Sequence, residues 1–147
     1  METTKKIIIY QVFTRLFGNQ NKTCQPDGDI ETNGCGKMND FTKQALHEIK
    51  KLGATHIWYT GLLAHASQTD YTAYGIPKNH PSIVKGKAGS PYAIRDYYDV
   101  DPDLAEHVDK RMEEFQHLVK RTHECGLKMI IDFVPVSYTH LRAHETV

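Results

Sequence analysis

Three short apolar segments constrain the fold of this 147-residue chain more than any other feature of its sequence. Each is rich in β-branched and aromatic residues, and the three are residues 7–13 (IIIYQVF), 54–63 (ATHIWYTGLL) and 127–134 (LKMIIDFV). Nearly continuous apolar runs of this length are typical of strands that are buried on both faces of a parallel sheet. We therefore expect three strands in one sheet.

Two helical patterns lie between these segments. The first is expected to begin with Asp40 as its N-cap and to end at Gly53 as a C′ glycine, with apolar residues Phe41, Ala45, Leu46, Ile49 and Leu52. The second runs from Asp109 to Gly126, and its predicted core-facing residues are Met112, Phe115, Val119 and Thr122. This alternation predicts an α/β fold with right-handed crossovers, either an open doubly wound sheet or part of a (β/α)8 barrel.

The connections that follow the first two strands are long, whereas those from helix to strand are short. Residues 14–39 and 64–102 contain many glycine, proline and asparagine residues and no regular apolar period, so we expect loops there. Both candidate folds place their binding sites on loops at the carboxyl ends of the strands. Neither loop carries a glycine-rich phosphate-binding motif, which disfavours a nucleotide-binding fold.

The composition of the chain limits which binding partners and which cellular location we expect. Eighteen lysine and arginine residues balance eighteen aspartate and glutamate residues, which gives no electrostatic reason to expect nucleic acid or an anionic membrane as partner. The N-terminal apolar run is too short for a secretory signal, and no stretch approaches 18 apolar residues, so we expect a cytoplasmic protein. Cys24, Cys35 and Cys125 are therefore expected to be reduced, although Cys24 and Cys35 could instead form a disulfide or share a metal.

Four segments together resemble the α-amylase family, glycoside hydrolase family 13. They are IIYQVFTRLFG, GATHIWYTG, GSPYAIRDYYDVDPDLA and EFQHLVKRTHECGLKMIIDFVP, which follow the family's order and spacing over residues 7–135. The resemblance implies that the α/β chain forms the first three strands and two helices of a TIM (β/α)8 barrel, truncated after the third strand. Residues 1–135 would then be the N-terminal part of the catalytic barrel.

The resemblance gives Tyr92 a sugar-binding role. Tyr92, Asp96 and Tyr97 match the family pattern Gly-Tyr-x-x-x-Asp-Tyr, although Pro91 stands here where a glycine is usual. In the family this tyrosine stacks on the sugar ring next to the scissile bond, because a pyranose has an apolar face that an aromatic ring can cover. The alternative is that the tyrosines pack the loop against the barrel, and we favour that alternative for Tyr97 and Tyr98.

Asp132 is the second predicted substrate-binding residue. It matches the aspartate of the family's Asp-x-x-x-Asn-His motif at the end of the third strand. A single carboxylate in this place could also be a structural hydrogen-bond acceptor, but the resemblance favours a place in the active site. Of the scattered histidines, His65 is the one expected to line a site, because it follows the second strand.

The Asp-x-x-x-Asn-His motif is interrupted. Val136 and Ser137 stand where the family has an asparagine, typically a calcium ligand, and a histidine that binds substrate. Calcium is thus possible in the parent enzyme, but the expected ligand is replaced, and no metal site is predicted. Residues 136–147 resemble translated sequencing-adaptor DNA and are interpreted as a non-native tail. In a rival interpretation, His140 and His144 form a zinc-ligand pair on a helix.

The implied parent is a retaining glycosidase that acts on α-glucosidic bonds of an α-glucan or maltooligosaccharide. Such chemistry needs a carboxylate nucleophile and a carboxylic acid about 5 Å apart. In the family, the catalytic carboxylates lie on the fourth, fifth and seventh strands, so no catalytic residue is expected in this chain, and the chain itself is predicted to be inactive. One alternative is a non-catalytic sugar-binding βα protein; another is a fragment that pairs with a complementary half-barrel.

Overall fold

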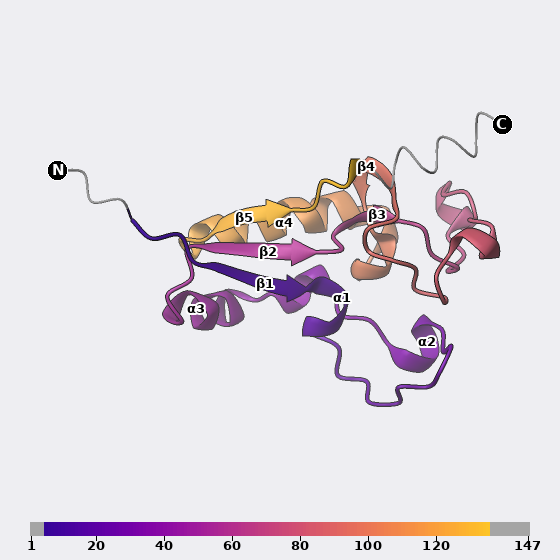
Figure 1. Ribbon diagram of the computed structural model, residues 1–147, viewed down its shortest axis with the longest axis horizontal. Helices are drawn as coiled ribbons and strands as arrows, with labels where there is room; N and C mark the ends of the chain where they lie inside the picture. The colour runs from indigo at the N-terminus through magenta and orange to yellow at the C-terminus, as the bar shows by residue number, and fades with distance from the viewer. Residues whose placement is uncertain (1–4, 136–147) are drawn as a thin grey trace.

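Three parallel strands form the main sheet of the computed structural model, which describes residues 5–135. They are β1 (Ile9–Phe13), β2 (His56–Thr60) and β5 (Lys128–Ile131), in the order β1-β2-β5 (Figure 1). Ile9 pairs with His56, and His56 pairs with Lys128, so the strands start level with one another. The predicted α/β fold with a parallel sheet is confirmed.

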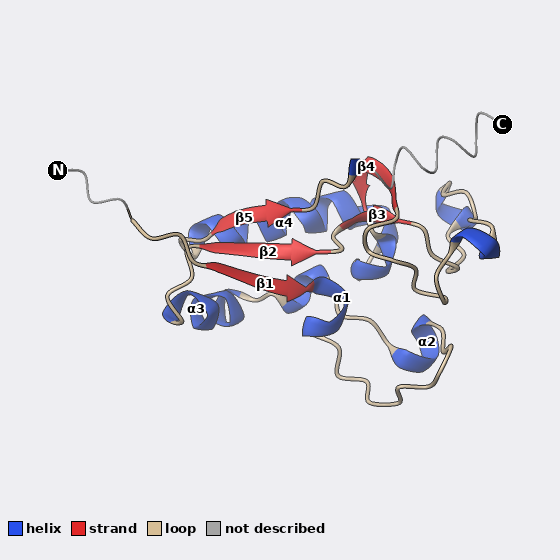
Figure 2. Ribbon diagram, viewed as in Figure 1, coloured by secondary structure: helices blue, strands red, loops and turns tan. Residues whose placement is uncertain are grey.

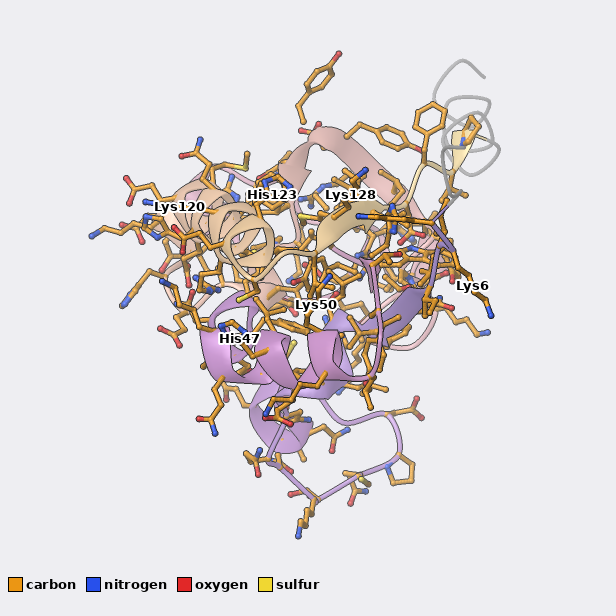
Figure 3. The ribbon with its side chains drawn as sticks, turned by 90° about the vertical axis from the view of Figure 1, so that its left-hand side faces the viewer. Lys6, His47, Lys50, Lys120, His123 and Lys128 are labelled. Atoms are coloured by element: carbon orange, nitrogen blue, oxygen red, sulfur yellow. The ribbon has the colours of Figure 1, made fainter. Side chains whose placement is uncertain are left out.

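Two helices pack together against this sheet. They are α3 (Lys43–Lys51) and α4 (Arg111–Glu124), and Figure 3 shows them side by side when the strands are viewed from their amino-terminal ends. Val12, Ile57 and Tyr59 of the sheet are buried in the same apolar cluster as Leu46 of α3 and Leu118 of α4. The main core is therefore the layer between sheet and helices, at one side of the sheet.

The start of α3 differs from the prediction. The Thr42 side chain accepts a hydrogen bond from the backbone N–H of Ala45 and is the N-cap, whereas Asp40 ends the short 3₁₀-helix η1 (Met38–Asp40). The Asp40 carboxylate accepts instead from the N–H of Lys37 at 2.6 Å. The predicted end is confirmed, because Gly53 follows the helix with a φ of +93°, a conformation that glycine adopts without strain.

Helix α4 begins at Arg111, after the 3₁₀-helix η5 (Val108–Lys110), and Gly126 follows its last turn at φ +77°. Its fully buried face differs from the predicted one: Glu114, Leu118 and Thr122 are buried, while Met112 is exposed. Thr122 belongs to both sets, and the predicted Phe115 is partly buried and packs against the core. The helix is rotated about its axis relative to the prediction because of Glu114. Its carboxylate turns inward and accepts hydrogen bonds from three N–H donors.

A second, antiparallel sheet stands at the carboxyl end of the first. The predicted strand 54–63 is interrupted at Gly61, which has a φ of +79°, and the chain continues as β3 (Leu63–His65). β3 pairs with β4 (Ile94–Val100), which lies in a region predicted to be loop. The prediction failed there because IRDYYDV does not alternate regularly and because bulges on both sides of Ala64 break the pairing into short pieces.

Short helical turns fill the two long connections (Figure 2). They are α1 (Thr14–Phe17), α2 (Ile30–Asn33), η2 (Thr72–Tyr74), η3 (Pro81–Ile83) and η4 (Pro102–Leu104). Cys24, Cys35 and Cys125 are free thiols. No helix within residues 5–135 is long and apolar enough to cross a membrane.

One face of the sheet is open. The prediction that the first strand is buried on both faces is wrong, since the side chains of Ile9 and Phe13 are 50% and 38% exposed while Val12 between them is buried. Ile131 is also exposed, but it pairs with Tyr59 and therefore lies on the helix-covered face, at the end of the outer strand β5. The sheet therefore has one packed face and one face with exposed apolar side chains.

Candidate functional site

The carboxyl ends of β1, β2 and β5 meet at one edge of the sheet, because the strands are parallel and level. The segments that follow them, α1, Gly61 and Asp132, lie at this edge, and β3 and β4 stand beyond it (Figure 1). Both predicted substrate-binding residues, Tyr92 and Asp132, belong to this end of the molecule.

Asp132 joins the ends of β5 and β2. Its Oδ1 accepts a hydrogen bond from Nε1 of Trp58 at 2.9 Å, and its Oδ2 accepts from the backbone N–H of Gly61 at 3.1 Å. The residue is buried. Both carboxylate oxygens thus have protein donors, which is the structural role that the sequence left as the alternative; contact with a substrate stays a prediction.

Tyr92 lies in a tight turn. Its backbone N–H donates to Oγ of Ser90 at 3.3 Å, the N–H of Ala93 donates to the Ser90 carbonyl at 3.0 Å, and the N–H of Ala66 donates to the Ala93 carbonyl at 3.0 Å. These bonds fasten the turn to the end of β3. The Tyr92 side chain remains 41% exposed, so part of its ring is open to a ligand.

Gly61 links this turn to Asp132. A Cβ at position 61 would lie 3.0 Å from Cβ of Pro91, so the turn packs directly against the glycine. The same glycine donates its N–H to Asp132. The order of contacts is therefore Asp132, Gly61, Pro91 and Tyr92, and the two predicted residues belong to one continuous structure although they are 40 positions apart in sequence.

The two neighbouring tyrosines behave differently from each other. Tyr97 packs on Phe133, with ring centroids 5.3 Å apart, and its hydroxyl accepts from the N–H of Val134 at 3.1 Å. Its predicted packing role is confirmed. The same prediction is wrong for Tyr98, whose side chain is 94% exposed.

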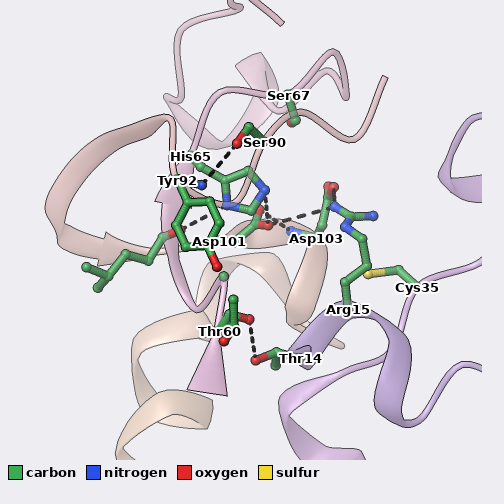
Figure 4. A network of polar contacts seen from close by, with 12 residues as sticks. Thr14, Arg15, Cys35, Thr60, His65, Ser67, Ser90, Tyr92, Asp101 and Asp103 are labelled. Carbon is green, nitrogen blue, oxygen red and sulfur yellow. Dashed lines mark hydrogen bonds and ion pairs between the residues drawn. The ribbon is translucent and has the colours of Figure 1, made fainter. Parts of the chain in front are cut away.

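A buried cluster of charged groups lies next to the Tyr92 turn (Figure 4). His65 of β3 approaches Asp101, with Nε2 3.2 Å from Oδ2, and Arg15 of α1 pairs with Asp103 of η4. Nη2 of Arg15 lies 3.8 Å from the same Oδ2 of Asp101. The Tyr71 hydroxyl also donates to Asp103, so the cluster joins the segments that follow β1 and β2 to the turn after β4.

Burial dominates the electrostatics of this cluster. It raises the pKa of Asp101 to about 6, against the opposing attraction of His65 and Arg15. Burial likewise raises the pKa of the Cys35 thiol to about 11 and moves the pKa of Tyr71 upward. Of this cluster, the sequence analysis predicted His65 alone, because contacts among residues 15, 65 and 101 depend on the tertiary fold. The Asp-Pro-Asp sequence at 101–103 was the one local pattern that could have indicated Asp101 and Asp103.

A pocket of about 570 Å³ lies on another side of this cluster, between the loop after β1 and the segments near residues 68 and 87. Arg15 and Asp103 belong to its lining, together with Asn19, Asn21, Asp29, Glu31, Gln68 and Lys87 among others. Neither Tyr92 nor Asp132 lines it. The pocket is thus distinct from the structure formed by the two predicted residues.

Metal ligation has little support in the described part of the chain. Within residues 5–135, no three His, Cys, Asp or Glu side chains are placed together to hold an ion. Val136 and Ser137, the histidine pair His140 and His144, and the whole interpreted tail lie outside the described residues. We therefore derive no role for calcium or zinc.

The family follows from a comparison with protein-family models. The model of the alpha amylase catalytic domain matches residues 11–143, which is most of the chain. The chain belongs to the α-amylase family. Its parallel strands, the aspartate that ends β5 and the tyrosine turn beside it are thus parts of an α-amylase-type catalytic domain.

Individual relatives are distant and much longer. Maltase A1 of Drosophila melanogaster is 26% identical over 107 residues, covering 73% of this chain and 14% of its own length. Cyclomaltodextrin glucanotransferase of Bacillus sp. (strain 1-1) is 27% identical over 139 residues, covering 88% of this chain and 17% of its own length. The crystal structure of Bacillus licheniformis trehalose-6-phosphate hydrolase matches with a TM-score of 0.51 and 23% identity, over 88% of this chain and 17% of that one. The chain therefore spans about a sixth of these proteins, and it shares the fold of the hydrolase over that part.

Proposed function

We propose that this chain supplies the sugar-stacking wall of a retaining glycosidase that acts on α-glucosidic bonds of starch or maltooligosaccharides. Residues 1–135 form the first three strands and two helices of its (β/α)8 barrel. The catalytic carboxylates belong to later strands, so the chain alone binds sugar and does not cleave it. The names of the maltase and the glucanotransferase support this substrate class.

The observation that carries the proposal is the clamped Tyr92 turn. A partly exposed aromatic ring is held at the carboxyl end of a parallel sheet, where barrels place their active sites. Ser90, Gly61 and β3 fix its backbone, so little conformational entropy is lost when a sugar ring covers it. Asp132 holds the neighbouring strand end in place.

Tyr92→Ala tests the proposal. We expect the variant to bind maltoheptaose about tenfold more weakly than the wild-type chain, a loss of roughly 1.4 kcal/mol, since the aromatic face that covers the pyranose is gone. Isothermal titration calorimetry measures the affinity, and a reducing-sugar assay measures hydrolysis, which should be absent from both proteins.

Tyr98→Ala is the matched control. It removes the same side chain from a position that is 94% exposed, where the backbone N–H donates a hydrogen bond to Asp96 and the ring takes no part in that bond. Affinity should remain within about twofold of wild type. Equal losses in both variants, or no binding by the wild-type chain, would contradict the stacking role of Tyr92.

The parent enzyme is tested at the level of its DNA. We expect an independent read through the Pro135 codon to continue into Asn-His and later to supply three catalytic carboxylates. A read that reproduces Val136–Val147 and then a stop would exclude the hydrolase for this gene product.

In that case a second function gains weight, namely a non-catalytic sugar-binding protein. The observation in its favour is that the contacts of the Tyr92 turn, and those of the β3 segment to which it is fastened, come from residues 61–101 of this chain. It predicts that the chain binds maltoheptaose with the same affinity in EDTA and in millimolar calcium.

A further inference from the structure

His65 and Asp101 form a buried pair whose hydrogen-bonding needs one extra proton. Nδ1 of His65 lies 3.1 Å from the carbonyl oxygen of Leu63, and Nε2 lies 3.2 Å from Oδ2 of Asp101. Both ring nitrogens therefore face acceptor oxygens. A neutral imidazole carries one N–H, so whichever nitrogen holds it, the other directs a lone pair at an oxygen.

The Asp101 carboxylate also lacks a hydrogen-bond donor. Its carboxylate is completely buried, and among the side chains of residues 5–135 its Oδ2 is the buried oxygen that lacks a hydrogen-bond donor. Oδ1 is satisfied by the N–H of Asp103 at 3.1 Å, and Arg15 is too far from Oδ2, at 3.8 Å, to donate to it. In this structure the contact between Nε2 and Oδ2 has an ion-pair distance but is not a hydrogen bond, and a proton placed between the two atoms would let Nε2 donate to Oδ2 while Nδ1 donates to the Leu63 carbonyl.

This pair lies where it can control the Tyr92 turn. His65 is the β3 residue opposite Ile94 of β4, and the next residue, Ala66, donates its N–H to Ala93. On the other side, the N–H of Asp101 donates to the Leu62 carbonyl at 2.9 Å. The pair therefore fixes β3 between the turn at residue 101 and the segment that carries Tyr92.

We propose that His65 is a positioning residue for Tyr92, and that the proton shared between His65 and Asp101 holds β3 and the Tyr92 turn in the sugar-binding conformation. When the proton leaves, one ring nitrogen of His65 is left with its lone pair facing an acceptor oxygen, at either Leu63 or Asp101, so the contact that holds β3 to Asp101 weakens and the turn loosens. This inference rests on the proposed sugar-binding role of Tyr92.

The direction of the pH dependence follows from the groups that surround the pair. Burial opposes the charged carboxylate, and the neighbouring Asp103 also favours the proton, while Arg15 opposes it. Because the folded state holds this proton more tightly than the unfolded chain does, its contribution is present at acidic pH and is lost as the pH rises. The other titratable or charged groups that face the cluster are Cys35, Lys37 and Tyr71.

The experiment measures maltoheptaose affinity by calorimetry at about pH 5 and about pH 8, on either side of the value of about 6 to which burial raises the pKa of Asp101. Wild-type affinity should fall about tenfold from pH 5 to pH 8, because loss of one hydrogen bond to a charged group has an effect of about this size. His65→Gln should bind equally at both pH values, because an amide N–H can donate to Asp101 without titrating. His65→Ala should bind weakly at both.

His47→Gln is the matched control, since His47 is exposed on α3 at the opposite end of the strands (Figure 3). It should keep the wild-type pH dependence. A wild-type affinity that is equal at both pH values, or a pH dependence that survives in His65→Gln, would overturn the positioning role.

A second readout needs no sugar and separates this inference from the proposed function. The amide of Ala93 closes the Tyr92 turn, so its protection from hydrogen exchange, corrected for the intrinsic rate, should drop about tenfold from pH 5 to pH 8 in the wild type and stay constant in His65→Gln. If the chain binds no maltoheptaose but shows this pattern, the proposed function fails while the positioning role of the His65–Asp101 pair stands. Protection that does not change with pH in the wild type overturns that positioning role.

Discussion

Single residues at the carboxyl end of the sheet act through the hydrogen bonds that they accept. Asp132 is the clearest case, because the family pattern marks it as part of an active site while its two oxygens are occupied by Trp58 and Gly61. The two roles are compatible: a carboxylate that fixes the end of β2 also fixes the glycine against which the Tyr92 turn packs. The residue positions the site even if no sugar touches it.

Asp132→Ala should lower the free energy of unfolding by about 2–4 kcal/mol, because it leaves the partly buried N–H of Trp58 and the buried N–H of Gly61 without an acceptor. Asp132→Asn should cost less, since the amide oxygen can still accept one of the two hydrogen bonds. Urea unfolding followed by the fluorescence of Trp58, the only tryptophan, measures both.

Asp109→Ala, at an exposed position, is the control and should change stability by less than about 0.5 kcal/mol. An Asp132→Ala variant as stable as this control would show that the two hydrogen bonds do not matter.

At the scale of elements, a polar residue sets the orientation of α4. Glu114 accepts from Nδ2 of Asn39 at 2.9 Å and from the backbone N–H groups of Glu106 and His107 at 2.9 and 3.1 Å. Glu114→Ala should therefore cost about 2–4 kcal/mol in urea unfolding. Glu113→Ala, the exposed neighbour, should be nearly neutral, and a cost shared equally by both variants would mean that helix propensity, not these bonds, is responsible.

The same element shows what the sequence can and cannot predict. Apolar runs gave the three parallel strands, and Gly53 gave the end of α3, because these depend on local patterns. The rotation of α4 could not be predicted, since a buried glutamate looks like a surface residue until its donors are known. β4 was missed for a related reason: its pairing with β3 is irregular, and only the tertiary fold brings residues 63 and 100 together.

The candidate site was partly predictable for the same reasons. Tyr92 and Asp132 were found by resemblance, and His65 by its place after a strand. The Arg15, Asp101 and Asp103 cluster was not found, because it consists of single residues from three distant segments whose burial no local pattern reveals. Pairs that depend on tertiary contact are where sequence reasoning stops.

The whole molecule is dominated by its open sheet. β1 and β5 each have one neighbour, and the face that the helices leave uncovered carries exposed Ile9 and Phe13. An unpaired, apolar strand edge is a template for association with another chain. Whether a later part of the same barrel or a separate half-barrel covers this face in nature, the isolated chain presents it to solvent.

We therefore expect the chain to associate with itself, with a weight-average mass that rises between about 1 µM and about 100 µM in sedimentation velocity. Ile9→Lys places a charge on the β1 edge and should shift this rise to several-fold higher concentration at little cost in stability, because the Ile9 side chain is already half exposed. Ile83→Lys makes the same change at a similarly exposed position in η3, away from the sheet, and should leave association unchanged. A chain that stays monomeric over the whole range and melts cooperatively would contradict the idea that its open face needs a partner, and would instead favour a small sugar-binding protein that is stable by itself.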